Sequence, residues 1–463
     1  MIDVSEAVQT FLALGPALMM PVILFILSLI FRQPLGKSAR SAILVGVAFV
    51  GIFAVLEACL FVIGGAVTCM VSRWGLTLEG VDIGWPLTAA ITWAVPVAAI
   101  MIPLAFIVNI ILLVPGWTKT FDADVWNYWH WAFTAVMVYM LTGNLILTYA
   151  IAITVEILVL KLADWTAPLA QKFFNIPGCS LPHTETVNWA PINLALEKAL
   201  FSRIKTLDKV KTDTTSIGEK LGLWGEPLMI GFYVGIILGI IAGLPVSGIF
   251  ELGIYLAALL FLEGRLVGIL IEGLMPIANG IRDYFSKTKR FKGREILIGI
   301  DAAPIALANP TVVAVGFISL PILMVMAFIP GNRILPLADL AILPIFFMWT
   351  AAVSRGNMVK TFFNGLIVLA LILYMQNAFA APLTQAAGMI GYALPAGIVL
   401  ASSLDAGGHI LPFILIMPVV AIMSGNPVEA VIPVIMGIIY FAAWYYARDQ
   451  PKLIAEKLEA SDT

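Results

Sequence analysis

The sequence contains few charged residues, few cysteines and few histidines. Asp, Glu, Lys and Arg make up 12% of its 463 residues, whereas soluble domains carry about 25%. Hydrophobic residues make up 61% of the chain, and its mean hydropathy is +1.00. These values exclude a soluble globular protein and indicate a polytopic protein in the lipid bilayer. The net charge of −2 gives no indication of nucleic-acid binding, because the basic residues lie in short clusters between apolar runs.

Several sequence signals of chemistry are missing. Cys59, Cys69 and Cys179 are too widely spaced for a zinc motif or a disulfide framework. No two histidines have zinc-ligand spacing on one helix, so we expect no metal site. The chain has no Walker A loop and no G-x-G-x-x-G segment after a strand. We therefore expect no cofactor and no transport driven by the chain's own ATP hydrolysis.

Apolar runs long enough to cross a bilayer recur along the chain. Residues 11–31 are uncharged for 21 positions, which is enough to span about 30 Å of hydrocarbon. The acidic start lacks the basic region of a signal peptide, and the loop after the run is basic, so we expect a retained first helix and an external N-terminus. Further spans are expected at 41–71, 86–117, 131–160, 228–246, 248–262 with an amphipathic continuation to about 280, 311–330, 336–353, 361–380, 388–403, 410–424 and 428–447. We predict an all-α polytopic membrane protein with about ten to twelve transmembrane helices and re-entrant segments.

The remaining polar segments are short. We expect one membrane domain over residues 1–463, with an interfacial and cytoplasmic connector at 165–227 and a cytoplasmic tail at 448–463. Pro96 and Pro103 interrupt one of the spans, as in transporters whose helices break near a binding site. A weak similarity between the turns at 82–86 and 405–409 suggests a duplication.

Asp301 is the first candidate for contact with a polar substrate. It lies in an apolar stretch, EILIGIDAAPIALANPTV (295–312), after a strongly basic segment. A carboxylate at the centre of a straight helix would cost about 2.5–3.5 kcal/mol, and the nearby prolines release carbonyls that lipid cannot satisfy. The stretch therefore suits a protein-enclosed, wet cavity. The alternative is that Asp301 caps a helix or pairs with a basic residue of the preceding loop.

The three histidines lie beside glycine or proline breaks and carboxylates. His130 ends WNYWH, His183 lies in SLPHTETVNWAP, and His409 lies in LDAGGHILP together with Asp405. A single histidine at a membrane interface is more often a hydrogen-bonded anchor than a ligand. The recurrence of this setting at all three positions favours a functional role.

Sugars and polyols need hydrogen-bond partners for their hydroxyls and an aromatic face for their C–H bonds. Four groups supply this mixture. They are Asp82 with Trp85, His130 with Trp126, His183 with Thr184, and Asp301.

Three other carboxylates lie in or beside apolar segments. Glu57 and Glu156 could join Asp301 in a proton or sodium path, since ionisable groups in a bilayer are commonly functional. The alternative for Glu57 and Glu156 is an internal partner, because no glycine or proline break flanks them. Glu226 either lies at a broken helix or is a helix N-terminal residue favoured by the dipole.

Seven motifs occur in an order that resembles one transporter family. The motifs are DIGWP (82–86), DVWNYWH (124–130), LPHT (181–184), WGEP (224–227), ILIGIDAAPIALANPTVV (296–313), LPLADLA (335–341) and SRGN (354–357). Over nearly its whole length the chain resembles the membrane IIC component of the galactitol-type phosphoenolpyruvate-dependent phosphotransferase system (PTS), which is distantly related to the ascorbate permease.

The resemblance implies a homodimer in the bacterial inner membrane, with a scaffold domain and an elevator-type core built from inverted repeats. It also implies phosphorylation of the substrate by a phosphocysteine on a separate IIB subunit, which a separate IIA subunit serves. By motif, the substrate-binding residues would be Asp82, Trp85, His130, His183, Thr184 and Asp301, with gating or secondary roles for Glu226, Asp405, His409 and Glu57.

The chain departs from the family pattern at Thr184-Glu185-Thr186, at ALANPT (306–311), and at Glu57 and His409. Galactitol is the expected substrate, and arabitol, another pentitol or a related ketose would suit the same chemistry. The alternative function is an ion-coupled secondary transporter that uses Glu57, Glu156 and Asp301. A membrane-embedded acyltransferase would need a closely spaced His-Asp or metal cluster, which the sequence does not display.

Overall fold

The computed structural model describes residues 16–75, 77–204, 206–207, 222–287, 294–394 and 398–462. The first half contains α2 (Pro16–Ile30), α3 (Leu35–Trp74), β1 (Gly80–Asp82), α4 (Trp85–Ala94), α5 (Pro96–Leu113), β2 (Thr120–Asp122), α6 (Val125–Thr142), α7 (Leu145–Phe173), β3 (Cys179–Ser180), α8 (Thr184–Val187), α9 (Ala190–Ala199) and η1 (Phe201–Arg203). The second half begins with η2 (Gly222–Gly225), α12 (Pro227–Ala242), α13 (Val246–Lys287), β4 (Leu297–Gly299), α14 (Ala303–Leu307), α15 (Pro310–Met326) and β5 (Ile334–Leu335). It ends with η3 (Ala338–Ala341), η4 (Leu343–Phe347), α16 (Met348–Val353), α17 (Met358–Met389), β6 (Leu400–Ser402), α18 (Leu404–Gly408), α19 (Ile410–Met423), η5 (Pro427–Ala430), α20 (Val431–Tyr446) and α21 (Gln450–Asp462).

The all-α polytopic fold is confirmed. Within the described ranges, six helices are long and apolar enough to cross a membrane: Leu35–Trp74, Pro96–Leu113, Leu145–Phe173, Val246–Ile281, Met358–Met389 and Pro427–Tyr446. Shorter apolar helices lie at Pro21–Ile30, Pro227–Ala242, Pro310–Met326, Leu343–Val353 and Ile410–Met423. The expected break at Pro96 is present, because α4 ends at Ala94 and Pro96 begins α5, but the interruption expected at Pro103 is wrong, because α5 passes through it. A proline at the first position of a helix loses no hydrogen bond that the helix could have made.

Two of the predicted spans differ from the structure. The span expected at 388–403 is wrong, because α17 continues to Met389 and residues 400–402 form the strand β6. The segments expected at 248–262 and to about 280 form one helix, α13, which passes through Pro276. Apolar composition alone does not distinguish the end of a long helix from a short buried strand.

Six short strands make two three-stranded sheets within the helical body. One sheet has the order β5-β1-β6 and the other β2-β4-β3, and every described pairing is parallel. In the first sheet Asp82 lies opposite Ser402, and in the second Gly299 lies opposite Asp122 and Ser180. The carboxyl ends of the three strands in each sheet therefore meet at one edge.

The order of elements is duplicated, and the two halves exchange strands. The series from α2 to α9 has the same alternation of helices and strands as the series from α12 to α19. The first half supplies the central strand of one sheet and both edge strands of the other, and the second half does the reverse. By this order β1 corresponds to β4 and β3 to β6. The correspondence suggested between the turns at 82–86 and 405–409 is therefore wrong, because these turns follow β1 and β6, which occupy different places in the two series.

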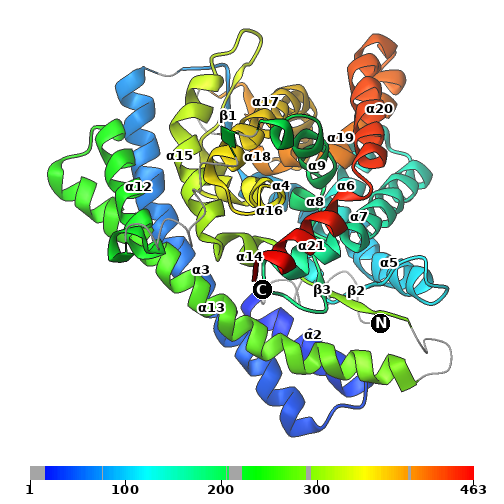
Figure 1. The fold of residues 1–463 in the computed structure, drawn as a ribbon. Coiled ribbons are helices and arrows are strands. Elements are labelled where there is room, and N and C mark those ends of the chain that lie inside the picture. Colours follow the sequence, from blue (N-terminus) through cyan, green and yellow to red (C-terminus); the bar gives the residue numbers. More distant parts are fainter. Residues whose placement is uncertain are drawn as a thin grey trace.

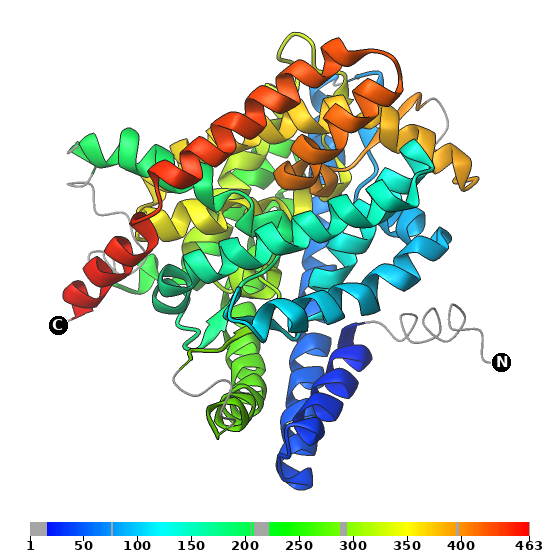
Figure 2. The same cartoon turned by 90° about the vertical axis from the view of Figure 1, so that its right-hand side faces the viewer.

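Four helices, α2, α3, α12 and α13, pack on one another and form what we call the arm. Figures 1 and 2 show α2, α3 and the end of α13 extending from the rest of the molecule, which we call the core. The core holds both sheets and the most deeply buried aromatic residues, including Trp129, Trp131, Trp189 and Trp349.

The segment 165–227 contains several different elements. Its first residues continue α7 to Phe173, and β3, α8 and most of α9 are buried in the core. Residues 205 and 208–221 lie outside the described ranges. The tail expected at 448–463 contains α21, which packs on α7.

A buried ion pair joins α9 to α17. Lys360 Nζ lies 3.2 Å from Glu197 Oε1, and their side chains are 4% and 11% exposed. Breaking a buried ion pair by removing one of its members costs about 3–5 kcal/mol. We expect Lys360→Met to lower the thermal stability of the purified protein markedly and the double variant with Glu197→Gln to recover part of it. Equal melting temperatures for Lys360→Met and the wild type would contradict this role.

Candidate functional site

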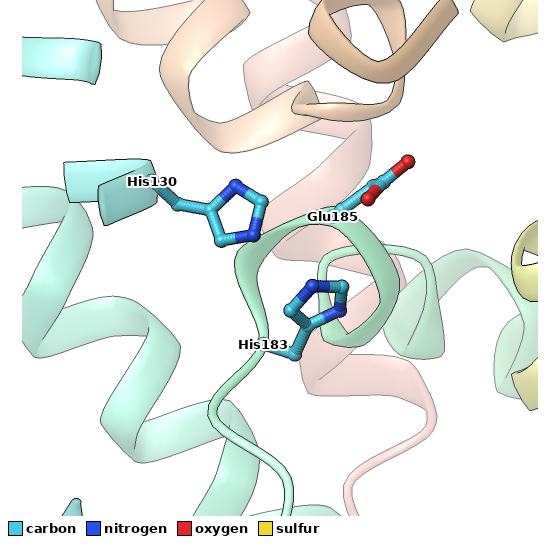
Figure 3. Close-up of side chains that lie close together, drawn as sticks. All are labelled: His130, His183 and Glu185. Carbon is cyan, nitrogen blue, oxygen red and sulfur yellow. The ribbon is translucent and has the colours of Figure 1, made fainter. Parts of the chain in front are cut away.

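The three histidines meet in the core. The ring centroid of His130 lies 4.7 Å from that of His183 and 4.9 Å from that of His409. Each residue is 1% exposed. Figure 3 shows the His130 ring beside that of His183, with the Glu185 carboxylate close to both. Contact of the His130 ring with both other imidazoles, which come from distant parts of the chain, marks this cluster as the candidate site.

Strand ends bring these side chains together. His183 follows β3 and is the N-cap of α8, and His409 lies between α18 and α19, just after β6. His130 lies in the second turn of α6, which follows β2 and is capped by Asp124 through the backbone N–H of Trp126. The two sheets thus direct polar residues from both halves of the chain into one place.

His183 is held on both sides of its ring. Its Nε2 lies 3.4 Å from Asp301 Oδ1, and its Nδ1 lies 3.3 Å from Thr186 Oγ1. Burial lowers the pKa of His183 to about 3, so its imidazole is neutral. A neutral imidazole has one N–H, so one of these two nitrogens can donate and the other can accept.

Asp301 joins the start of α14 to the histidine cluster. Its Oδ1 accepts from the backbone N–H of Ala303, the first residue of α14, at 3.0 Å, and also lies 3.4 Å from His183 Nε2. The backbone N–H of Asp301 donates to Asp124 Oδ2 at 3.1 Å. Residues 288–293 of the basic loop lie outside the described ranges.

Asp124 and Asp301 lie in loops outside the spanning helices. Burial and the nearby charge of Asp301 raise the pKa of Asp124 to about 7, and burial raises the pKa of Asp301 to about 6. Near neutral pH this pair therefore carries less than two full negative charges.

A second histidine–carboxylate pair adjoins the cluster. His409 Nε2 lies 3.1 Å from Asp405 Oδ1, and the Asp405 side chain is 3% exposed. Burial, together with the nearby charge of Asp405, raises the pKa of Glu185 well above its usual range. These two residues come from β3–α8 and β6–α18, which are corresponding parts of the two halves.

Asp82 and Asp339 bind mainly backbone groups. The Asp82 carboxylate accepts from the backbone N–H groups of Leu337, Asp339 and Leu404. Asp339 accepts from the backbone N–H groups of Trp85 and Asp405 and from the Ser403 hydroxyl. Asp82, which the sequence suggested for substrate contact, thus ties together the loops of its own sheet.

Tryptophans form one wall of the site. The rings of Trp85 and Trp126 lie 5.5 Å apart, Trp126 stacks on Trp129 at 5.5 Å, and Trp129 contacts His130 at 5.0 Å. Trp85 is 38% exposed, whereas Trp129 is buried. This series of rings leads from the protein surface to the histidines.

Many polar atoms around the histidines are buried without a hydrogen-bond partner among the described residues. They include both ring nitrogens of His130 and of His409, Thr184 Oγ1, Glu185 Oε1, both amide atoms of Asn188, both amide atoms of Gln376 and Trp129 Nε1. Buried polar groups in native proteins are nearly always paired. Such a concentration of donors and acceptors suits a ligand rich in hydroxyl groups.

Three suggested residues lie apart from this cluster. Glu57 is exposed on α3 of the arm, and Glu226 is exposed at the N-terminus of α12. Glu156 is buried on α7, and within the described chain neither of its carboxylate oxygens has a hydrogen-bond partner. Its electrostatic neighbour is Asp122.

Sequence reasoning missed Glu185, Asp124 and Asp339 as residues in or directly behind the site. The sequence does contain a signal, because each of these acidic residues lies two to five positions after the end of a short strand. Recurrence of this pattern along the chain could have identified them.

A crevice opens where the arm meets the core, next to the histidines. Leu24, Phe49, Leu270, Asp124 and Asp301 are among its lining residues. Asp301 thus contacts His183 while also lining this crevice.

Comparison with known proteins gives consistent matches along the chain. A family described as "PTS system sugar-specific permease component" matches residues 10–397. The galactitol-specific EIIC component of the PTS from Escherichia coli (strain K12) is 34% identical over 449 residues, which cover 96% of this chain and 97% of that relative. A provisionally named permease IIC component of the same strain is 35% identical over 397 residues, which cover 86% of this chain and 90% of that relative.

Proposed function

Because the chain belongs to the family of PTS sugar-specific permease components, we propose that it imports a polyol, with galactitol as the first choice. In this proposal the polyol is phosphorylated during import by a separate IIB subunit that carries a phosphocysteine and is supplied by a IIA subunit. The chain would be a multi-pass protein of the bacterial inner membrane. The galactitol-specific relative in Escherichia coli supports the choice of substrate.

The observation that carries this proposal is the cluster of buried polar atoms that have no hydrogen-bond partner among the described residues and that surround three imidazoles beside a tryptophan wall. A polyol presents hydroxyl groups that both donate and accept, and C–H bonds that pack on aromatic faces. His130, with two ring nitrogens available, can bind two hydroxyls. The tryptophans exclude water and provide the apolar face.

We propose that the core carries the polyol and that the arm is the scaffold of an elevator-type movement. Support comes from the division of contacts: the site residues lie in the core, and a crevice at the boundary with the arm reaches Asp301. Movement along this boundary would expose the site to IIB. We also expect a homodimer, as the resemblance implied, which mass measurement of the protein in nanodiscs can test.

Uptake into membrane vesicles tests the proposed function. Labelled galactitol is supplied with or without phosphoenolpyruvate and the soluble PTS proteins, and the internal label is identified. Phosphorylated galactitol that appears only with the complete relay supports the proposal. Accumulation of free label without the relay, abolished by an ionophore, would instead support the ion-coupled alternative with Glu156 and Asp301.

His130 is expected to contribute directly to affinity. In His130→Ala the polyol hydroxyls that bind this ring lose their partners, at about 1–3 kcal/mol for each buried group left unsatisfied. We expect about 5- to 150-fold weaker galactitol binding by calorimetry of the purified protein. Met140→Ala is a matched control, because Met140 lies on the same helix, is half-buried and has no hydrogen-bonding donor for the site. Equal losses in both variants would contradict a direct role for His130.

A further inference from the structure

The histidine cluster contains two overlapping sets of possible metal ligands. One set is His130, His183 and Glu185, and the other is His130, Asp405 and His409. In each set the ligand atoms all lie within 4.8 Å of one another, and every residue is buried. Two imidazoles and one carboxylate are the protein ligands of several catalytic zinc sites, which keep the fourth position open.

We propose that His130, Asp405 and His409 bind a divalent transition-metal ion, with Zn²⁺ as the best fit, and that this ion competes with the polyol. The earlier expectation of no metal site considered only ligand pairs on one helix. Here His130 comes from α6, while Asp405 and His409 come from the region that follows β6.

The arrangement of Asp405 and His409 favours this set. Asp405 Oδ1 and His409 Nε2 lie 3.1 Å apart, yet neither atom makes a hydrogen bond with a described residue. The two atoms are thus close together without the N–H of the ring pointing at the oxygen. Ligands of one Zn²⁺ ion at 2.0–2.1 Å are about 3.3 Å apart in tetrahedral geometry. The observed spacing needs little change to hold an ion.

The first set is less suitable because His183 is already engaged. Its Nε2 faces Asp301 and its Nδ1 faces Thr186. His130 and His409, in contrast, have ring nitrogens without partners among the residues described. Binding a metal through His183 would require breaking its pair with Asp301.

The donor atoms favour zinc over magnesium. Imidazole nitrogen suits Zn²⁺, whereas Mg²⁺ prefers oxygen ligands and keeps its waters.

Competition with the polyol rests on the proposed function. The nitrogens that would bind the metal are those that we assign to polyol hydroxyls. One site cannot use the same lone pairs for both ligands at once.

Zinc binding to the full-length protein tests the inference. The protein, purified in nanodiscs and freed of metal, is titrated with Zn²⁺ or Mg²⁺ by calorimetry, and the zinc-loaded protein is analysed by X-ray absorption. We expect one Zn²⁺ per chain, nitrogen and oxygen ligands at about 2.0–2.1 Å, and no comparable binding of Mg²⁺. Binding of both ions with equal affinity would overturn the proposal.

Variants assign the ligands. We expect at least about tenfold weaker zinc binding in His409→Gln and Asp405→Asn, both small changes in volume, with unchanged elution and melting profiles. Cys69→Ser removes an exposed thiol that could bind zinc on its own, and His183→Ala removes the competing set. Both are expected to retain zinc binding. Loss of binding in either control, or retention in His409→Gln, would overturn the assignment.

A competition measurement separates this inference from the proposed function. We expect galactitol to weaken the apparent affinity for Zn²⁺ and Zn²⁺ to inhibit uptake. Zinc binding through the assigned ligands without competition would support the metal site and overturn the placement of the polyol. Relay-dependent uptake of galactitol by a chain that binds no zinc would overturn the metal site and leave the transport function standing.

Discussion

Replacing Asp301 by Asn is expected to abolish uptake and to weaken polyol binding by about 10- to 150-fold at pH 7.5. A hydrogen bond to a charged group contributes about 1.5–3 kcal/mol, which gives this range. The amide oxygen of Asn can still accept from the backbone N–H of Ala303. This oxygen carries no full charge and is a weaker acceptor for His183, whose Nε2 lies 3.4 Å from Asp301 Oδ1. The fold should survive, because the hydrogen bond to Ala303 is kept.

The effect of Asp301→Asn should depend on pH. Asp301 has a pKa of about 6 in the folded protein, so the wild-type carboxylate is mostly ionised at pH 7.5 and mostly protonated at pH 5. His183, with a pKa of about 3, stays neutral over this range. The ratio of the galactitol affinities of the wild type and of Asp301→Asn should therefore fall about tenfold between pH 7.5 and pH 5, because the wild type loses its charge.

Binding of galactitol by calorimetry at the two pH values measures this gap. Glu295→Gln is the matched control. Glu295 lies six residues before Asp301 and makes an exposed ion pair with Lys119. Exposed pairs contribute about 0–1 kcal/mol, so the control should behave as the wild type. A constant ratio between wild type and Asp301→Asn at both pH values would contradict the role of the Asp301 charge.

Replacing Gly84 by Ala is expected to destabilise the core by about 2–6 kcal/mol, the sum of backbone strain and overpacking. Gly84 has φ +83° and ψ −171°, a region essentially restricted to glycine. An added Cβ would lie 2.6 Å from Asp339 Oδ1 and 2.9 Å from the Cβ of Ala338. The carboxylate cannot move freely, because it accepts from the backbone N–H groups of Trp85 and Asp405.

Gly75 provides the matched control for Gly84. It has φ +62° at the C-terminus of α3, and an added Cβ would meet nothing within 4 Å. Gly75→Ala should therefore cost only the left-handed conformation, about 1–2 kcal/mol. Thermal unfolding and the yield of monodisperse protein in detergent measure both variants. Equal melting temperatures and yields for Gly84→Ala and Gly75→Ala would show that contact with Asp339 does not add to the destabilisation.

The breaks in the helices were predictable in part. Pro304, three residues after Asp301, and Pro96 each indicated a broken helix, and both breaks occur. The same reasoning failed at residues 388–403, since an apolar run of that length fits a helix end, a loop and a buried strand equally well. The sequence also gave no indication that the Asp82 carboxylate accepts from the backbone of two neighbouring loops.

By itself, the amino-acid sequence determined that the chain is a polytopic membrane protein and a PTS permease component, because composition and ordered motifs need no knowledge of contacts. Only the tertiary structure decided that His130, His183 and His409 share one site. The physical reason is the exchange of strands between the two halves. Each parallel sheet collects strand ends that lie more than 170 residues apart in the chain, such as Asp122 and Gly299, and no local pattern encodes that pairing.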